Sequence, residues 1–241
     1  MPDQKTFDRK APAHASGFDL KAAALAAVQQ YGSAPGFPAG IAQQLASLAS
    51  PPQPSAESAP DLRDLLWSSI DNDTSRDLDQ IEFAQPLPDG SWKVMIAVAD
   101  VDAWVAKDSP IDGHAAKETT TVFTGVQVFP MLPEQLSTGL TSLLEAQDRL
   151  ALVTEFVVRT DGHLGDTDVY RARVRNHAQL TYSAVGAWLE HRGDAPAKVS
   201  ASPELQTQLR LQNQIAQAIS SPRRIRTWRA SMENCVKNAC G

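Results

Sequence analysis

The feature that most constrains this chain is a run of nine residues, Asp71–Asp79, that contains four aspartates. Asp71, Asp73, Asp77 and Asp79 follow directly on an apolar stretch. Carboxylates crowded in this way repel one another unless a cation offsets their charge. A hard divalent ion with oxygen ligands, Mg²⁺ or Ca²⁺, is the natural occupant. The run therefore indicates either a solvated acidic loop, with Asp and Asn as turn residues, or a divalent metal site.

Two kinds of metal site fit this spacing at first sight. An EF-hand needs a glycine at the sixth loop position and a helix after the loop, whereas this chain has Arg76 there and continues into Ile81–Ala84 and Pro86. That continuation alternates like a strand, so we reject the EF-hand. A catalytic site, in which carboxylates hold one or two Mg²⁺ ions for phosphoryl transfer, tolerates both features and is the leading interpretation.

Composition bounds the class of protein. The chain has 241 residues, of which 42% are hydrophobic and 21% charged, which is typical of a globular protein that buries a core. A formal net charge of −6 argues against a surface that coats nucleic acid, but not against an enzyme with a narrow basic channel. The two cysteines, Cys235 and Cys240, offer neither a disulfide framework nor a zinc pattern.

The sequence shows no signal for export or membrane insertion. Met1–Lys5 lacks the basic and apolar regions of a secretory signal, and no apolar run is long enough to span a bilayer. We therefore expect a cytoplasmic protein with reduced thiols and no membrane partner.

The hydrophobic pattern predicts an α+β chain in three parts. Within residues 1–60 we expect a polar tail and two Ala-rich helices, Leu20–Tyr31 and Ile41–Leu48. A proline-rich linker follows over 50–60, and we place a domain boundary there. Beyond it we expect strands over 78–84, 92–99, 122–129, 150–158 and 168–175. The expected helices or turns cover 61–67, 112–121, 134–144, 178–190 and a stretch beginning at Ser202. Residues 220–241 show no apolar periodicity.

Alternation along residues 168–175 places three arginines on one strand face. Arg171, Arg173 and Arg175 form either a solvated edge face or a stripe that contacts phosphates. Asp100 and Asp102, which follow the apolar strand 92–99, are interpreted as turn carboxylates at its end.

Several motifs, in one order, resemble the catalytic domain of the ribonuclease II/ribonuclease R (RNB) family of exoribonucleases. They are Ser69–Asp79, Ile96–Val101, Phe129–Ser137, Asp148–Leu152 and Arg173–Asn176. The likeness runs from about Leu62 to about Ala218. It implies an RNB-type catalytic domain over 61–219, with a mixed or antiparallel sheet and covering helices, between a short helical segment with its linker and an atypical tail over 220–241.

The resemblance also implies a chemistry. Members of the family cleave single-stranded RNA from the 3′ end with Mg²⁺ and release nucleoside 5′-monophosphates. Asp71 and Asp77 would help to hold the metal, and Asp79 would be the residue whose loss most damages hydrolysis. Gln80 stands where the family usually has a further aspartate, and it would ligate only through an uncharged amide oxygen. Asp73 has no counterpart role and is treated as auxiliary.

Phe123 matches the family position that stacks the 3′-terminal base, although a core phenylalanine is an equal alternative. Arg173 and Arg175 are the candidate phosphate contacts. Two departures lead us to expect low activity: residues 1–60 are too short for the family's RNA-binding barrels, and the likeness stops near residue 219, as in a chain truncated at its C-terminus. The alternative hypothesis is therefore a non-catalytic RNA- or metal-binding fragment; a complete protein is expected to be a monomer.

Overall fold

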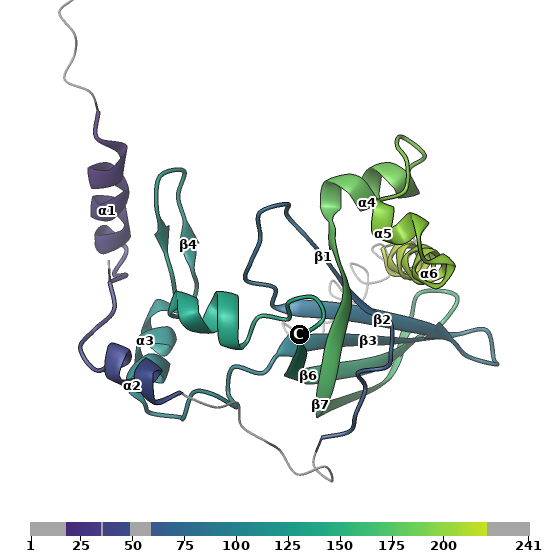
Figure 1. Ribbon diagram of the computed structural model, residues 1–241, viewed down its shortest axis with the longest axis horizontal. Coiled ribbons are helices and arrows are strands. Elements are labelled where there is room, and N and C mark those ends of the chain that lie inside the picture. The colour runs from purple at the N-terminus through teal and green to yellow at the C-terminus, as the bar shows by residue number, and fades with distance from the viewer. Residues whose placement is uncertain (1–17, 35, 49–58, 221–241) are drawn as a thin grey trace, which may run out of the picture.

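The computed structural model describes residues 18–34, 36–48 and 59–220. Its centre is a closed barrel of five strands (Figure 1). Around the barrel the order is β1 (Trp67–Asp71), β2 (Gln80–Pro86), β3 (Trp92–Ala99), β6 (Asp148–Val158) and β7 (Leu164–Thr181). Neighbouring strands are antiparallel except for β1 and β7, which close the barrel in parallel. The predicted α+β class with a mixed sheet is confirmed.

The barrel forms because alternate side chains along each strand point to the same face, so that an apolar face of each strand fills the interior. The interior residues include Ile81, Phe83, Met95, Ala97, Ala151, Val153, Ala172 and Val174. Trp67, at the start of β1, is fully buried against them, and its indole Nε1 donates a hydrogen bond to the carbonyl of Leu62 (2.8 Å). The hairpin between β2 and β3 turns at Gly90, whose φ of 85° suits glycine.

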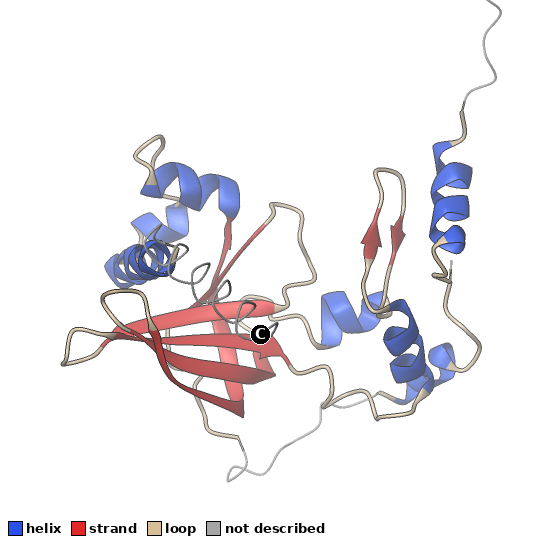
Figure 2. Cartoon of the chain, turned by 180° about the vertical axis from the view of Figure 1, so that it is seen from behind, coloured by secondary structure: helices blue, strands red, loops and turns tan. Residues whose placement is uncertain are grey.

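Helices flank the barrel on opposite sides, as Figure 2 shows. They are α1 (Leu20–Gln30), α2 (Ile41–Ser47), α3 (Pro110–Glu118), α4 (Tyr182–Leu189), α5 (Ala197–Ser200) and α6 (Pro203–Ile219), with a π-helix η1 (Gln135–Leu140). Helix α6 lies against β2, where the Gln208 amide bonds both the N–H (3.1 Å) and the carbonyl (2.6 Å) of Ala84. Within the described ranges, no helix has the length and apolar character needed to cross a bilayer.

Helix α2 belongs to a second apolar cluster beside the barrel. Ile41 of α2 packs with Val105, Ile111 of α3 and Leu136 of η1. The side chain of Gln44 accepts a hydrogen bond from the Ile111 N–H (2.9 Å) and donates one to the hydroxyl of Ser109, the cap of α3 (2.9 Å). Most of the predicted linker, the tail over residues 1–17 and nearly all of the tail over 220–241 lie outside the described residues.

Two predicted segments differ from the structure at the place where β1 and β7 pair. Residues 61–67, predicted to form a helix or a turn, form a turn that leads into β1, and the Leu62 N–H donates to the carbonyl of Arg173 (2.9 Å). Strand β7 continues to Thr181, six residues beyond its predicted end and into the predicted helix over 178–190. The added residues pair with β1, so tertiary pairing overrides their local helical pattern.

Three further boundaries differ. The predicted strand over 122–129 is a small hairpin of β4 (Val122–Phe123) and β5 (Val128–Phe129), which turns between Thr124 and Gln127. The predicted helix over 134–144 is the shorter π-helix η1. Helix α3 begins two residues before its predicted start, because Ser109 caps it and proline occupies its first turn.

Candidate active site

Asp71 is the last residue of β1 and lies where the barrel closes. One carboxylate oxygen accepts hydrogen bonds from the N–H of Asn72 (2.7 Å) and the hydroxyl of Ser75 (2.7 Å). These bonds fix the orientation of the carboxylate at the point where the acidic run leaves the strand. Asp71 is therefore held by its own loop before any ligand arrives.

Asp77 and Asp79 are exposed and flank Leu78, which is only 1% exposed. The Leu78 backbone is held on both sides, by the hydroxyl of Ser142 on its N–H (3.0 Å) and by the N–H of Leu143 on its carbonyl (2.8 Å). The Asp79 carbonyl accepts from the N–H of Ala99 (2.9 Å). Burial of Leu78 therefore points the two neighbouring carboxylates away from the core.

One pocket of about 500 Å³ brings these three aspartates together with Phe123. The pocket is lined by Asp71, Asn72, Ser75, Asp77, Leu78, Asp79, Val98, Ala99, Val101, Phe123, Met131, Leu132, Ser137 and Thr141. Phe123 projects from the β4–β5 hairpin with 68% of its surface exposed, so the alternative of a core phenylalanine is wrong. Carboxylates and an aromatic ring thus share a hollow that is otherwise mainly apolar.

Two members of the acidic segment do not line the pocket. Gln80 begins β2, and its amide donates weakly to Glu82 (3.4 Å). Burial raises the pKa of that glutamate. Asp73 accepts a hydrogen bond from Ser183 in α4 (3.2 Å). The structure therefore separates Gln80 and Asp73 from the three carboxylates that line the pocket.

The donor chemistry of the pocket fits Mg²⁺, because every polar side chain that lines it offers oxygen or, at Asn72, an amide with oxygen. Among the described residues, however, no three Asp, Glu, His or Cys side chains lie close enough to form a metal site. Asp71, Asp77 and Asp79 would have to approach one another around an ion.

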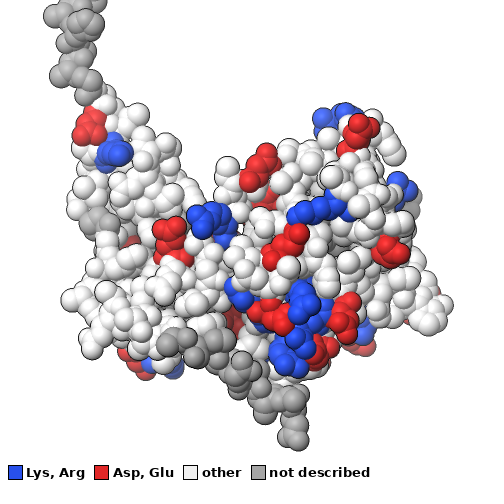
Figure 3. Space-filling model, viewed as in Figure 1, with Lys and Arg blue, Asp and Glu red and all other residues white. Residues whose placement is uncertain are grey.

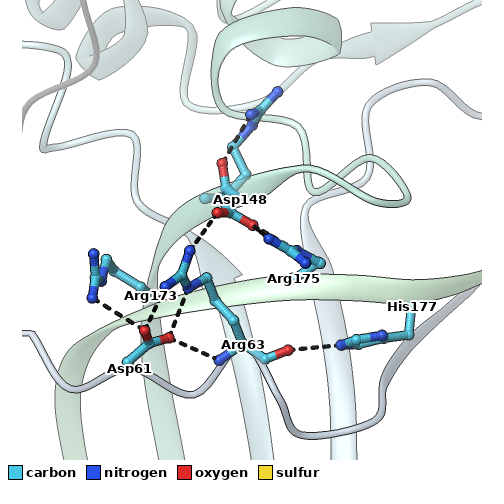
Figure 4. A network of polar contacts seen from close by, with 7 residues as sticks. Asp61, Arg63, Asp148, Arg173, Arg175 and His177 are labelled. Carbon is cyan, nitrogen blue, oxygen red and sulfur yellow. Dashed lines mark hydrogen bonds and ion pairs between the residues drawn. The ribbon is translucent and has the colours of Figure 1, made fainter.

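The arginines of β7 lie outside the pocket, in a network of ion pairs on the barrel surface (Figure 4). Arg173 contacts Asp61 (3.1 Å), and Arg175 contacts Asp148 (2.6 Å). Arg63 bridges the two carboxylates, with 2.6 Å to each. Figure 3 shows such side chains of opposite charge interleaved over the barrel.

The third arginine of this face, Arg171, pairs with the buried Asp100 and more loosely with Asp102 (3.5 Å). Asp100 also accepts from the N–H of Ala103 (3.1 Å), as a carboxylate in a turn at the end of a strand does. All three arginines thus have carboxylate partners, which matches a solvated, ion-paired face.

Arginine neighbours shift the carboxyl pKa values in this network. Hydrogen bonds from Arg63 hold the pKa of Asp61 well below its usual range. At Asp148, burial raises the pKa, but hydrogen bonds from Arg63 and Arg175 outweigh it and lower the pKa overall. Both groups are therefore ionised wherever the protein is studied near neutral pH.

Sequence reasoning missed two side chains beside the site. Tyr182 is 58% exposed and follows Thr181, which pairs with Asp71 across β1 and β7. Ser142 is buried and holds the backbone around Asp77. The first could have been noticed only if β7 had been extended to Thr181; the second carries no pattern in the sequence.

Comparison with known proteins gives consistent matches. Residues 60–236 match the RNB domain. Ribonuclease R of Vibrio parahaemolyticus is 38% identical over 155 residues, covering 64% of this chain and 19% of the relative. Exoribonuclease 2 of Vibrio cholerae is 36% identical over 132 residues, covering 54% of this chain and 19% of the relative. The chain thus spans about a fifth of the length of these curated relatives.

Solved structures agree on the fold. RNase R of Mycoplasma genitalium, solved in complex with double-stranded RNA, superposes with a TM-score of 0.71 at 26% identity, covering 81% of this chain and 34% of that one. Yeast Ssd1, described as a pseudonuclease, shares the fold at 17% identity with a TM-score of 0.51, covering 65% of this chain and 20% of its own. The domain match covers well over half of the sequence, and the chain belongs to the RNB family.

Proposed function

We propose that this chain is a catalytic segment of a hydrolytic exoribonuclease that shortens single-stranded RNA from its 3′ end with Mg²⁺ and releases nucleoside 5′-monophosphates. The observation that carries the proposal is the common pocket of Asp71, Asp77, Asp79 and the exposed Phe123. RNA as the ligand is supported by the relatives named ribonuclease R and by the RNA-bound structures of one of them.

The pocket offers two kinds of side chain, an aromatic ring with apolar neighbours for the base and carboxylates for the metal and the phosphate. Phe123 offers an exposed ring on which a terminal base can stack. The apolar walls beside it, Val98, Met131 and Leu132, would exclude water from the base. The carboxylates at the other part of the pocket would face the phosphate, where negative charge has to be offset.

Asp71, Asp77 and Asp79 would hold the metal, with Gln80 as an additional donor only if the start of β2 rearranges. When bound, Mg²⁺ would lower the pKa of a water and stabilise the charge that develops on the phosphate. We assign no arginine to the transition state. Arg173 and Arg175 would contact RNA phosphates outside the pocket, in competition with Asp61 and Asp148.

A 5′-labelled single-stranded RNA incubated with the protein and Mg²⁺ tests the proposal. Progressive shortening from the 3′ end is expected, and Asp79→Asn should slow it by at least about a hundredfold while RNA binding persists, because second-shell losses alone cost about 10–100-fold at metal sites. Asp194→Asn is a matched control: this exposed aspartate after α4 makes no hydrogen bond among the described residues.

The alternative function is RNA or metal binding without turnover. It has a specific basis, because Gln80 removes a charge that the family usually has and because a pseudonuclease shares the fold. RNA binding by the wild-type chain with no shortening at any Mg²⁺ concentration would support it. Equal rates in Asp79→Asn and the wild type would contradict the assigned site.

A further inference from the structure

Three buried polar residues lie beneath the acidic run on three different segments. Ser69 in β1, Ser142 after η1 and Asn176 in β7 are 3%, 1% and 1% exposed. Burying a polar side chain is unfavourable unless its hydrogen bonds are satisfied. Their bonds therefore show what these residues connect.

Ser142 holds the backbone on both sides of Asp77. Its hydroxyl donates to the carbonyl of Arg76 (2.8 Å) and accepts from the N–H of Leu78 (3.0 Å). The next residue, Leu143, donates its N–H to the Leu78 carbonyl (2.8 Å). The position of the backbone that carries Asp77 and Asp79 is thus fixed by residues 142 and 143.

Asn176 connects the same segment to β1. Its side-chain nitrogen donates to the Ser69 hydroxyl (2.9 Å) and to the Leu143 carbonyl (2.9 Å). Its side-chain oxygen accepts from the N–H of Ala178 (3.1 Å), so both ends of the amide are used. Ser69 precedes Asp71 by two residues on β1.

We propose that this buried network, formed by Ser69, Asn176, Leu143, Leu78 and Ser142, sets the spacing between Asp71 on one side and Asp77 and Asp79 on the other. It is a continuous path of hydrogen bonds from β1 through β7 and residues 142–143 to the acidic loop. Ser142 and Asn176 are positioning residues, since neither lines the pocket. The inference rests on the proposed function in one respect, that the three carboxylates share a metal.

The polar character of the network favours positioning over simple packing. An apolar core fills space but specifies register weakly, whereas a buried amide or hydroxyl accepts only an arrangement that satisfies it. Ligating carboxylates need their supporting contacts, and loss of such contacts weakens metal binding about 10–100-fold. The three carboxylates lie at the two ends of one loop, and the network contacts both ends from outside it.

Mn²⁺ binding, followed by electron paramagnetic resonance without RNA, tests the proposal. Ser142→Ala removes both hydroxyl contacts and should weaken Mn²⁺ binding on the order of tenfold. Ser68→Ala is the matched control, because Ser68 is also 1% exposed and close to Asp71, yet its hydroxyl has no hydrogen-bond partner in the described part of the chain. It should change Mn²⁺ affinity less than about twofold.

A second variant protects the test against misfolding. Ser142→Cys keeps a group of similar size with a weaker donor, so its Mn²⁺ affinity should lie between those of Ser142→Ala and the wild type. Hydrogen exchange at the Leu78 amide should quicken in the same order, because this amide loses its acceptor.

The outcomes separate the network from the proposed function. Wild-type protein that binds Mn²⁺ but does not shorten RNA would refute the exoribonuclease and leave the network supported by the order of affinities. Equal Mn²⁺ affinity in Ser142→Ala and Ser68→Ala would overturn the network even in an active enzyme. Failure of the wild type to bind Mn²⁺ would overturn both.

Discussion

Phe123 is unusual because 68% of its surface is exposed, which forgoes most of the hydrophobic free energy that burial of a phenylalanine would give. Its place in the pocket wall beside three aspartates gives the ring a reason to be exposed. An unstacked base at an RNA end presents an apolar face of similar size. These observations support the proposed role of the exposed ring as a stacking surface for the RNA end.

Phe123→Ala is expected to weaken binding of a short single-stranded RNA by about 1–3 kcal/mol, the value of one base stacked on an aromatic ring. Phe123→Tyr should bind like the wild type because the π-face remains. Fluorescence anisotropy of a labelled oligonucleotide measures both. Val126→Ala, at the tip of the same hairpin, is the control and should change neither affinity nor stability. Unchanged binding in Phe123→Ala would remove the ring from the site.

Residues whose chemistry forms a pattern could be predicted, and those that act through geometry could not. The run of four aspartates predicted a site, the resemblance selected Asp71, Asp77 and Asp79 from it, and the structure places these three in one pocket. Gln80 was grouped with them because it stands where the family usually has a further aspartate, but the pleat of β2 directs it toward Glu82. Ser142 could not be predicted, because nothing in the sequence indicates that a serine in a loop will bond the two backbone groups of Arg76 and Leu78.

Among the elements, α2 is short and weakly helical by itself, so its contact with α3 has to stabilise it. That contact combines the apolar packing of Ile41 with two hydrogen bonds from Gln44 to the N-terminal turn of α3. The bonds satisfy groups at a helix start that have no partner within the helix. Helix α3 in turn leads into the hairpin that carries Phe123.

Gln44→Ala is expected to lower the local stability of α3 by about 1–2 kcal/mol, because the Ile111 N–H loses its acceptor in a partly buried place. Native-state hydrogen exchange of the α3 amides measures the loss. Gln43→Ala is an exact chemical match on the exposed side of α2 and should leave exchange unchanged. Equal exchange in both variants would show that Ile41 alone holds the two helices together.

Elements with a complete local signal were predicted, whereas those that depend on a distant partner were not. The hairpin of β2 and β3 carries its turn residues and its alternation in one stretch, and helix α6 carries its Ser202 cap and proline. By contrast, β1 and the end of β7 exist because they pair with each other over about a hundred residues of sequence. Local pattern predicted a helix or turn up to Trp67 and a helix from residue 178, and the pairing of β1 with β7 overrides it.

At the scale of the whole molecule, residues 59–66 lead the chain into the barrel and run along β7 before β1 begins. Backbone bonds from Leu62 and to Pro60 hold it at Arg173 (2.9 Å each). The ion pairs of Asp61, Arg63 and Asp148 attach the same segment to β6 and β7. Protonation of the carboxylates should therefore loosen the point at which the chain enters the barrel.

The sign of the pH dependence follows from the pKa values. Asp61 and Asp148 have lower pKa values in the folded protein than in the unfolded chain, where the pKa of an aspartate is about 3.9. Each contributes stability above that pH, and the contribution disappears as the pH falls toward the folded pKa. Glu82 acts in the opposite sense: its raised pKa favours the protonated form in the folded state, so it opposes folding as it ionises.

We accordingly expect the urea midpoint of unfolding to fall as the pH is lowered from 5 to about 2.5. Asp61→Asn should flatten this dependence, because a neutral amide cannot lose its charge on acidification. Asp64→Asn is the control: Asp64 lies in the same segment and is exposed, but it forms no ion pair among the described residues, so this variant should follow the wild-type curve. Parallel curves for all three proteins would show that the segment is held by its backbone bonds alone. A flatter curve in Asp61→Asn only would show that the ion pairs stabilise the entry of the chain into the barrel.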